Sequence, residues 1–231
     1  PGCNSPGQRA VPIEVRLSGF VGIVEFDGRP ANPDLLGRMT RCLEFRGPDA
    51  STVRVDGAVG LGHTLLRTTD EAGHECQPFS VDGNIWIVAD ARVDERGELV
   101  AKLASLGCVT AVDRPDVELI LHAYRTWGEV CVDHLLGDFA FAIWDARRRQ
   151  LFVARDHLGV KPMFYAQLGS TVVFSNTLEC VREHPKVSAR LNDLAIADVQ
   201  APDVVEETTS FDVGVDLIAR SADRDFAERM Q

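Results

Sequence analysis

Two residue types in this sequence could supply covalent or metal chemistry, namely cysteine and histidine. A protein zinc site needs such ligands at short, regular spacing. The six cysteines contain no C-x-x-C pair, and the histidines have no metal-ligand spacing with one another. We therefore expect no metal site, no cofactor, free thiols instead of a disulfide framework, and partly buried histidines with ordinary partners. The residues considered are Cys3, Cys42, Cys76, Cys108, Cys131, Cys180, His63, His122, His134 and His157.

The apolar pattern predicts strands and helices that would position these groups. Gly19 to Phe26 is β-rich and ends at a turn signal, and Asn32-Pro33 then offers a helix N-cap. Hairpin turns are expected at Asp56-Gly57 and Asp82-Gly83. Further strands are expected at 85–89, 139–144, 151–154, 163–166 and 171–174, and helices from Asp94 to Gly107 and from Pro115 to Gly128. This order predicts two packed sheets covered by helices.

The two ends of the chain differ in composition from its middle. Residues 1–19 are rich in Pro, Gly, Asn and Gln without periodicity, so we expect a flexible leader. Residues 20–199 are expected to form one globular domain. Residues 200–231 lack a helical stripe and are expected to form an irregular tail.

The bulk properties exclude several classes of protein. The net charge of −11 and the pI of about 5.0 argue against nucleic-acid binding, which needs a basic patch. The longest apolar runs, such as 139–144, are far shorter than the ~20 residues that span a bilayer. The first twenty residues contain no signal-peptide apolar region. We therefore expect a cytoplasmic protein without a membrane segment.

Two polar clusters are interpreted as structural. The run Arg147-Arg148-Arg149 lies between two expected strands and indicates a solvated turn. Arg155-Asp156, with Gly159 and Lys161-Pro162, indicates a tight turn and an ion pair that hold the sheets together.

Four segments, in this order, resemble the N-terminal glutaminase domain of asparagine synthetase. They are G-I-V-E-F-D-G from Gly22, F-R-G-P-D-A from Phe45, G-D-F-A-F-A-I-W-D from Gly137, and A-R-D-H-L-G-V-K-P-M-F-Y from Ala154. The resemblance covers about 20–199. It implies an α+β fold, the four-layer αββα sandwich of N-terminal-nucleophile hydrolases, in a class II glutamine amidotransferase.

The resemblance also implies a reaction that this chain is not equipped to perform. Active members use an N-terminal Cys, followed by Gly, whose thiolate attacks the glutamine amide while its own α-amine acts as base. By alignment through Gly22, the nucleophile position is Val21, behind a leader of twenty residues. An isopropyl group cannot attack a carbonyl, so we expect no catalytic residue.

The family's oxyanion segment is altered as well. Its Asn-Gly-Glu matches the stretch around Ala89 and Asp90, so Asn becomes Ala89 and Gly becomes Asp90. A donor side chain is lost, and the Asp90 carboxylate would oppose a developing oxyanion. One missing donor alone can reduce the rate by ~10² to 10³.

The substrate-gripping residues of the family are only partly matched. The arginine that binds the substrate carboxylate falls at Leu65, and Arg67, two positions further, could face the same side of a strand. The acidic residue that receives the substrate amine matches Asp116. Its alternative role is to favour the first turn of a helix through the macrodipole.

Cys3 is an alternative nucleophile, because cleavage after Gly2 would free its amine. It lies eighteen residues before Val21 and is followed by Asn4 rather than Gly, which argues against this role.

These changes favour a retained fold with a discarded reaction. The stretch from Val88 to Arg96 resembles asparagine-synthetase-like lasso peptide cyclases, and β-lactam synthetases are similar in lacking a working glutaminase. The chain has no Ser-Gly-Gly-x-Asp pyrophosphate loop, so 200–231 is interpreted as the truncated start of a missing synthetase domain. We expect a non-catalytic scaffold or remnant beside an ATP-dependent synthetase that makes asparagine or cyclises a peptide. The alternatives are an active glutaminase subunit supplying ammonia, and a glutamine sensor without turnover that uses Arg67 and Asp116.

Overall fold

The computed structural model describes residues 17–67, 75–187 and 219–220. Most of the predicted leader and tail therefore lie outside the described residues. Nine strands form two sheets in this part of the chain, in the orders β2-β3-β1-β8-β7 and β4-β5-β6-β9. The strands are β1 (Gly19–Glu25), β2 (Ala50–Asp56), β3 (Val59–Leu65), β4 (Ile85–Asp94), β5 (Leu136–Asp145), β6 (Gln150–Arg155), β7 (Phe164–Leu168), β8 (Thr171–Ser175) and β9 (Ala219–Arg220).

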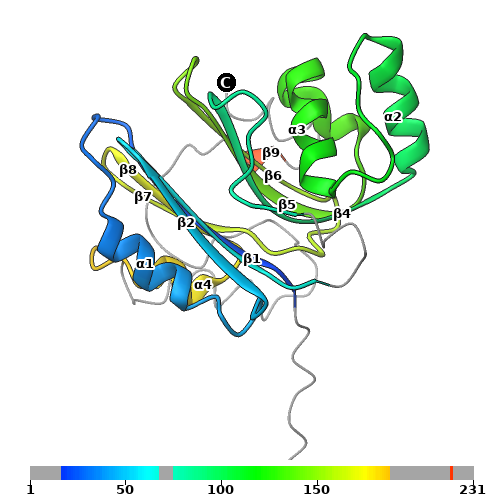
Figure 1. Cartoon of the computed structure of the whole chain (residues 1–231). Helices are drawn as coiled ribbons and strands as arrows, with labels where there is room; N and C mark the ends of the chain where they lie inside the picture. Colours follow the sequence, from blue (N-terminus) through cyan, green and yellow to red (C-terminus); the bar gives the residue numbers. More distant parts are fainter. Residues whose placement is uncertain (1–16, 68–74, 188–218, 221–231) are drawn as a thin grey trace, which may run out of the picture.

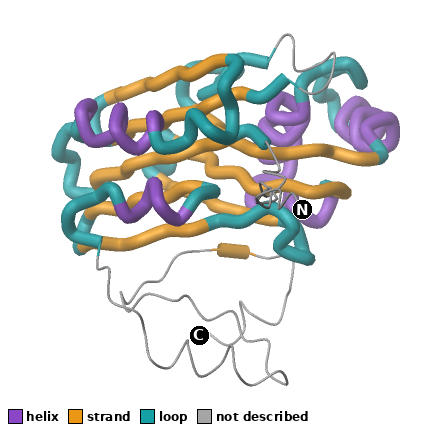
Figure 2. Tube along the Cα trace, turned by 90° about the horizontal axis from the view of Figure 1, so that it is seen from below, coloured by secondary structure: helices purple, strands orange, loops and turns teal. Residues whose placement is uncertain are grey.

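Helices cover the outer face of each sheet, which gives the predicted four-layer αββα arrangement (Figure 1). α1 (Pro33–Arg41) and α4 (Leu178–Arg182) lie on the first sheet, and α2 (Arg96–Ser105) and α3 (Asp116–Trp127) lie on the second. A 3₁₀ segment, η2 (Gly128–His134), continues from α3. Figure 2 shows that the strands of the two sheets run roughly alongside one another. Among the described helices, none is long and apolar enough to cross a membrane.

Three apolar clusters fill the spaces between these layers. One lies between the sheets and includes Phe20, Val88 and Phe174, and the other two lie between each sheet and its own helices. Within the first sheet, the Phe174 ring of β8 lies over its pairing partner Gly22 in β1, where a Cβ atom would lie 2.1 Å from the ring. A larger residue at that position would therefore force the sheet or the ring to move.

The local predictions were confirmed where short-range chemistry decides the structure. The Asn32 side chain accepts hydrogen bonds from two backbone N–H groups and caps α1, with Pro33 as its first residue. The predicted β2–β3 hairpin is present, but Asp56 pairs with Val59, so the turn consists of Gly57 and Ala58. At 82–83 the predicted hairpin is reduced to one isolated bridge, between Phe79 and Ile87.

The predicted Asp94 cap was wrong. Asp94 is the last residue of β4, pairs with Leu136, and binds the Arg92 side chain. The N-cap of α2 is Glu95, which has a left-handed backbone and no side-chain capping bond. Pairing with β5 extends β4 through Asp94 and displaces the helix start.

Candidate functional site

Val21, the expected nucleophile position, lies inside the apolar core. Side chains alternate along β1, so Phe20 and Val24 face the second sheet while Val21 and Ile23 face α1 and α4. Val21 is 0% exposed and belongs to the cluster that contains Leu36 and Met39. The position offers a ligand neither a reactive atom nor a solvent-accessible surface.

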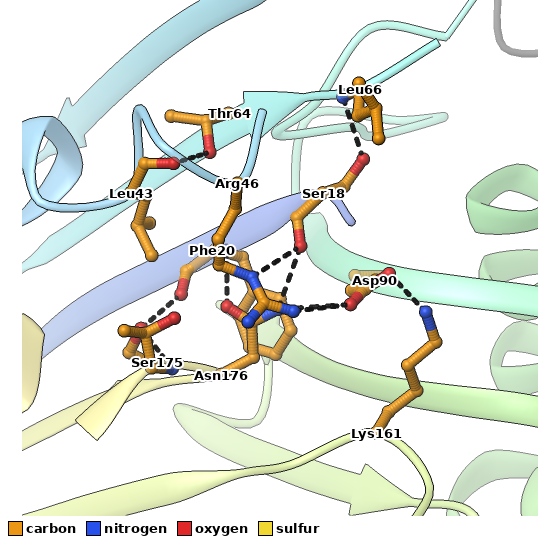
Figure 3. A network of polar contacts seen from close by, with 12 residues as sticks. Ser18, Phe20, Leu43, Arg46, Thr64, Leu66, Asp90, Lys161, Ser175 and Asn176 are labelled. Atoms are coloured by element: carbon orange, nitrogen blue, oxygen red, sulfur yellow. Dashed lines mark hydrogen bonds and ion pairs between the residues drawn. The ribbon is translucent and has the colours of Figure 1, made fainter. Parts of the chain in front are cut away.

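Asp90, the altered oxyanion position, lies in a buried ionic cluster (Figure 3). Its carboxylate is 2.9 Å from the Lys161 ammonium and 3.3 Å from the Arg46 guanidinium. The Asn176 amide also donates to it at 3.3 Å. Asp90 and Lys161 are only 4% and 7% exposed. Two cations therefore compensate the buried Asp90 carboxylate, which the sequence had suggested only as a group that would oppose an oxyanion.

The partners of Asp90 come from separate parts of the fold. Asp90 itself is in β4 of the second sheet, whereas Arg46 follows α1 and Asn176 follows β8 of the first sheet. Lys161 lies in the connection between β6 and β7, which are strands of different sheets. The cluster is therefore a polar link across the interface between the sheets. The sequence had predicted an ion pair near Lys161, but had not identified Asp90 as its partner.

Ser18 belongs to the same network and was missed by sequence reasoning. Its carbonyl oxygen accepts from Arg46 Nε at 3.3 Å and from Asn176 Nδ2 at 3.0 Å. Its hydroxyl oxygen accepts from the Leu66 backbone N–H at 3.2 Å. Ser18 immediately precedes Gly19, the first residue of β1, so a serine followed by glycine shares the partners Arg46 and Asn176 with Asp90. The Ser-Gly order in the sequence was the signal that could have identified it.

The backbone of Ala89 is held by a glutamine side chain. Its N–H donates to Gln77 Oε1 at 2.6 Å, and its carbonyl accepts from Gln77 Nε2 at 3.0 Å. The Gln77 amide also donates to the Glu75 carboxylate at 2.7 Å. Burial, with smaller contributions from Asp116 and Asp90, raises the pKa of Glu75. The Ala89 N–H already has an acceptor and is not a free donor for a substrate oxyanion.

His63 in β3 is buried near this segment. Burial lowers its pKa to about 3, and a hydrogen bond with the Ala89 backbone opposes the shift only partly. Its Nε2 atom has no hydrogen-bond partner among the described residues. The folded protein therefore holds a neutral imidazole between the sheets.

The two expected substrate contacts occupy structural roles in the described chain. Arg67 is exposed beyond β3, and its backbone N–H donates to the Asp49 carboxylate at 2.7 Å. Asp116 begins α3 and its carboxylate contacts the Arg96 guanidinium, which also donates to the Val112 carbonyl. The Asp116–Arg96 ion pair links the start of α3 to the start of α2, which is consistent with a helix-terminal role for Asp116.

Comparisons with known proteins show the family of the chain. The sequence profile of the family described as "Glutamine amidotransferase domain" matches residues 17–225. The chain belongs to this family. Its relatives include asparagine synthetase [glutamine-hydrolyzing] 3 of Bacillus subtilis, which is 35% identical over 187 residues, covering 79% of this chain and 30% of the relative. A putative asparagine synthetase [glutamine-hydrolyzing] of Mycobacterium tuberculosis is 37% identical over 177 residues, covering 69% of this chain and 27% of the relative.

Two solved structures share the fold at low sequence identity. A glutamine phosphoribosylpyrophosphate amidotransferase from B. subtilis matches with a TM-score of 0.57 and 17% identity, over 70% of this chain and 42% of the other. The allosteric regulatory enzyme of purine biosynthesis matches with a TM-score of 0.59 and 18% identity, over 71% and 43%. This glutamine amidotransferase domain is thus of the asparagine synthetase type in sequence, with the N-terminal-nucleophile hydrolase fold. It spans less than a third of either asparagine synthetase named here.

Proposed function

We propose that this amidotransferase domain is a non-catalytic scaffold that works beside an ATP-dependent, amide-forming synthetase. The observation that supports this proposal most directly is the ionic cluster of Asp90, Arg46 and Lys161. It lies at the position where the family's oxyanion donors are expected. An oxyanion hole requires free donors directed at the developing charge. Here the donors of Arg46 and Lys161 are directed at a resident carboxylate, and Ala89 N–H is bound to Gln77.

The nucleophile position supports the same proposal. Under the alignment through Gly22 the position is Val21, which has no reactive atom and is fully buried. The nearest hydroxyl upstream of Val21 is that of Ser18, which immediately precedes β1 and accepts a hydrogen bond from Leu66 N–H. The backbone nitrogen of Ser18 belongs to a peptide bond in this chain, so it is not the free α-amine that the family uses as base.

The proposed partner is a separate synthetase chain or domain that contains the pyrophosphate loop absent from this sequence. Its product would be asparagine or a cyclised peptide, as in the asparagine-synthetase-like cyclases that this chain resembles. Co-elution of the purified chain with such a synthetase on size-exclusion chromatography would support the pairing. Independent elution at concentrations well above micromolar would count against it.

The decisive experiment measures glutamate release from glutamine by the purified chain. The matched variants are Cys3→Ala, which removes the thiol upstream of Val21, and Ser18→Ala, which removes the hydroxyl nearest to it. The scaffold proposal predicts no release above a protein-free blank for any of the three proteins. Release abolished by either substitution would identify that residue as a nucleophile and would establish an active glutaminase.

A further inference from the structure

A cysteine, a histidine and a glutamate converge in the outer helical layer, on the side of the second sheet away from the ionic cluster. Cys108 Sγ lies 3.4 Å from His122 Nδ1. The other imidazole nitrogen, His122 Nε2, lies 3.8 Å from the Glu118 carboxylate. A thiol, a ring nitrogen that accepts its proton and a carboxylate that orients the ring are the components of an activated nucleophile.

The local fold fixes these three groups. α2 ends in a Schellman motif, in which Gly107 N–H donates to the Ala104 carbonyl and Cys108 N–H donates to the Leu103 carbonyl, each at 3.0 Å. Gly107 has φ +82°, which favours glycine. The motif turns the chain so that Cys108 faces α3. Glu118 and His122 are four residues apart on α3 and therefore lie on one face of it.

The electrostatic environment keeps the imidazole neutral near neutral pH. Burial lowers the pKa of His122, Arg125 and Arg114 lower it further, and Glu118 opposes them. A neutral ring with its proton on Nε2, toward Glu118, presents the Nδ1 lone pair to the thiol. The two arginines are themselves close to carboxylates, Arg114 to Glu118 at 3.8 Å and Arg125 to Asp82 at 4.0 Å.

Cys108 differs from the other described cysteines. Burial raises the pKa of Cys131 and of Cys180 to about 12, so these thiols are inert. Cys42 also has a raised pKa, mainly because of burial. Cys76 is exposed, whereas Cys108 is half-buried with a base within contact distance.

We propose that Cys108 is a covalent modification site that undergoes thiol–disulfide exchange with small-molecule disulfides. The Cys108 sulfur attacks one sulfur of the disulfide while His122 Nδ1 takes the thiol proton. A new S–S bond forms, the original S–S bond breaks, and the departing thiolate takes the proton from His122. Glu118 is a positioning residue that holds the ring.

The experiment uses the full chain and glutathione disulfide as the probe. Samples taken during incubation at pH 7 are quenched with acid and digested, and the mixed disulfide at each cysteine is quantified by mass spectrometry. Cys76 is the internal reference, because it is exposed. The variants are His122→Gln and Glu118→Gln, and His134→Gln is the matched control because His134 stacks on Trp127 in the same helical layer.

Cys108 is expected to react at least about tenfold faster than Cys76, because a positioned base typically contributes ~10² to 10⁴ in rate. His122→Gln should reduce the Cys108 rate toward that of Cys76, Glu118→Gln should reduce it less, and His134→Gln should leave it unchanged. Equal or slower reaction of Cys108 in the unmodified chain overturns the proposal, even if a variant fails to fold. An unchanged rate in a folded His122→Gln variant also overturns it, and would leave Cys108 as an apolar contact of the Schellman motif.

Discussion

The two halves of β4 contribute differently to the interface between the sheets. Trp86 and Val88 face the first sheet and pack in the apolar cluster between the sheets. Asp90, two residues further on the same face, meets Arg46, Lys161 and Asn176 instead. In the apolar half, the contributions to the free energy of unfolding are close to additive, because each side chain contributes according to its own buried area. The ionic half behaves as a unit, because removal of one charge leaves the others uncompensated.

The largest expected effect is that of Asp90→Ala, which leaves two largely buried cations without a counter-charge. Breaking a buried ionic group in this way should reduce the free energy of unfolding by about 3–5 kcal/mol. Val88→Ala, the matched change in the apolar half, should reduce it by about 2 kcal/mol. Urea denaturation of both variants measures the difference. A smaller loss for Asp90→Ala than for Val88→Ala would show that the ionic half is not a coupled unit.

The coupling itself is accessible through a double-mutant cycle of Asp90→Ala and Lys161→Met. Because the two side chains are in contact, the double variant should be more stable than the sum of the single effects predicts, by about 1–3 kcal/mol. A cycle of Val88→Ala with Lys161→Met is the control and should be nearly additive. Additivity in both cycles would contradict the comparison between the two halves.

Acid should weaken the interface through His63. Its pKa is about 3 in the folded protein and 6.5 in the reference state, so the unfolded chain binds more protons between these values. The free energy of unfolding therefore falls as the pH decreases through this window, by about 2 kcal/mol between pH 7 and pH 5 from His63 alone. Denaturation at both pH values tests this. His63→Gln should remove the contribution of His63 to the pH dependence of the free energy of unfolding. The contributions of His122 and His184, whose pKa values are also lowered, should remain.

The smallest expected effect is that of glutamine on thermal stability. Because Asp90 and its partners already satisfy one another, millimolar glutamine should not shift the melting temperature, whereas a ligand at 100 times its Kd would add about 2.7 kcal/mol. D-Glutamine serves as the control for non-specific solute effects. A stereospecific rise in melting temperature would favour the sensor alternative, and loss of that rise in Arg67→Ala would implicate Arg67.

The sequence was informative wherever the decisive interactions are local or repeated. The cap at Asn32 depends on residues two and three positions away, and the layer order follows from the alternation of strands and helices. The resemblance to asparagine synthetase, carried by four contiguous segments, led to the correct fold and family. These features need no knowledge of how distant strands are brought together.

The ionic cluster could not be predicted, because its members are far apart in the chain. Arg46, Lys161 and Asn176 are separated from Asp90 by 44, 71 and 86 positions. Only the stacking of two sheets brings them together, and single-sequence patterns do not specify which buried charge finds which partner. For the same reason the predicted structural ion pair near Lys161 was correct in kind, whereas its partner in the other sheet was not foreseen.

The placement of Asp90 between two cations also limits which single substitutions its site can accept. A change of Asp90 to glycine alone would leave Arg46 and Lys161 without their shared counter-charge in a mostly buried site. Replacement of either cation alone would weaken the compensation of a buried carboxylate. Every single substitution among these three residues therefore begins with a loss of stability, so we expect the three charges to be kept together or replaced together.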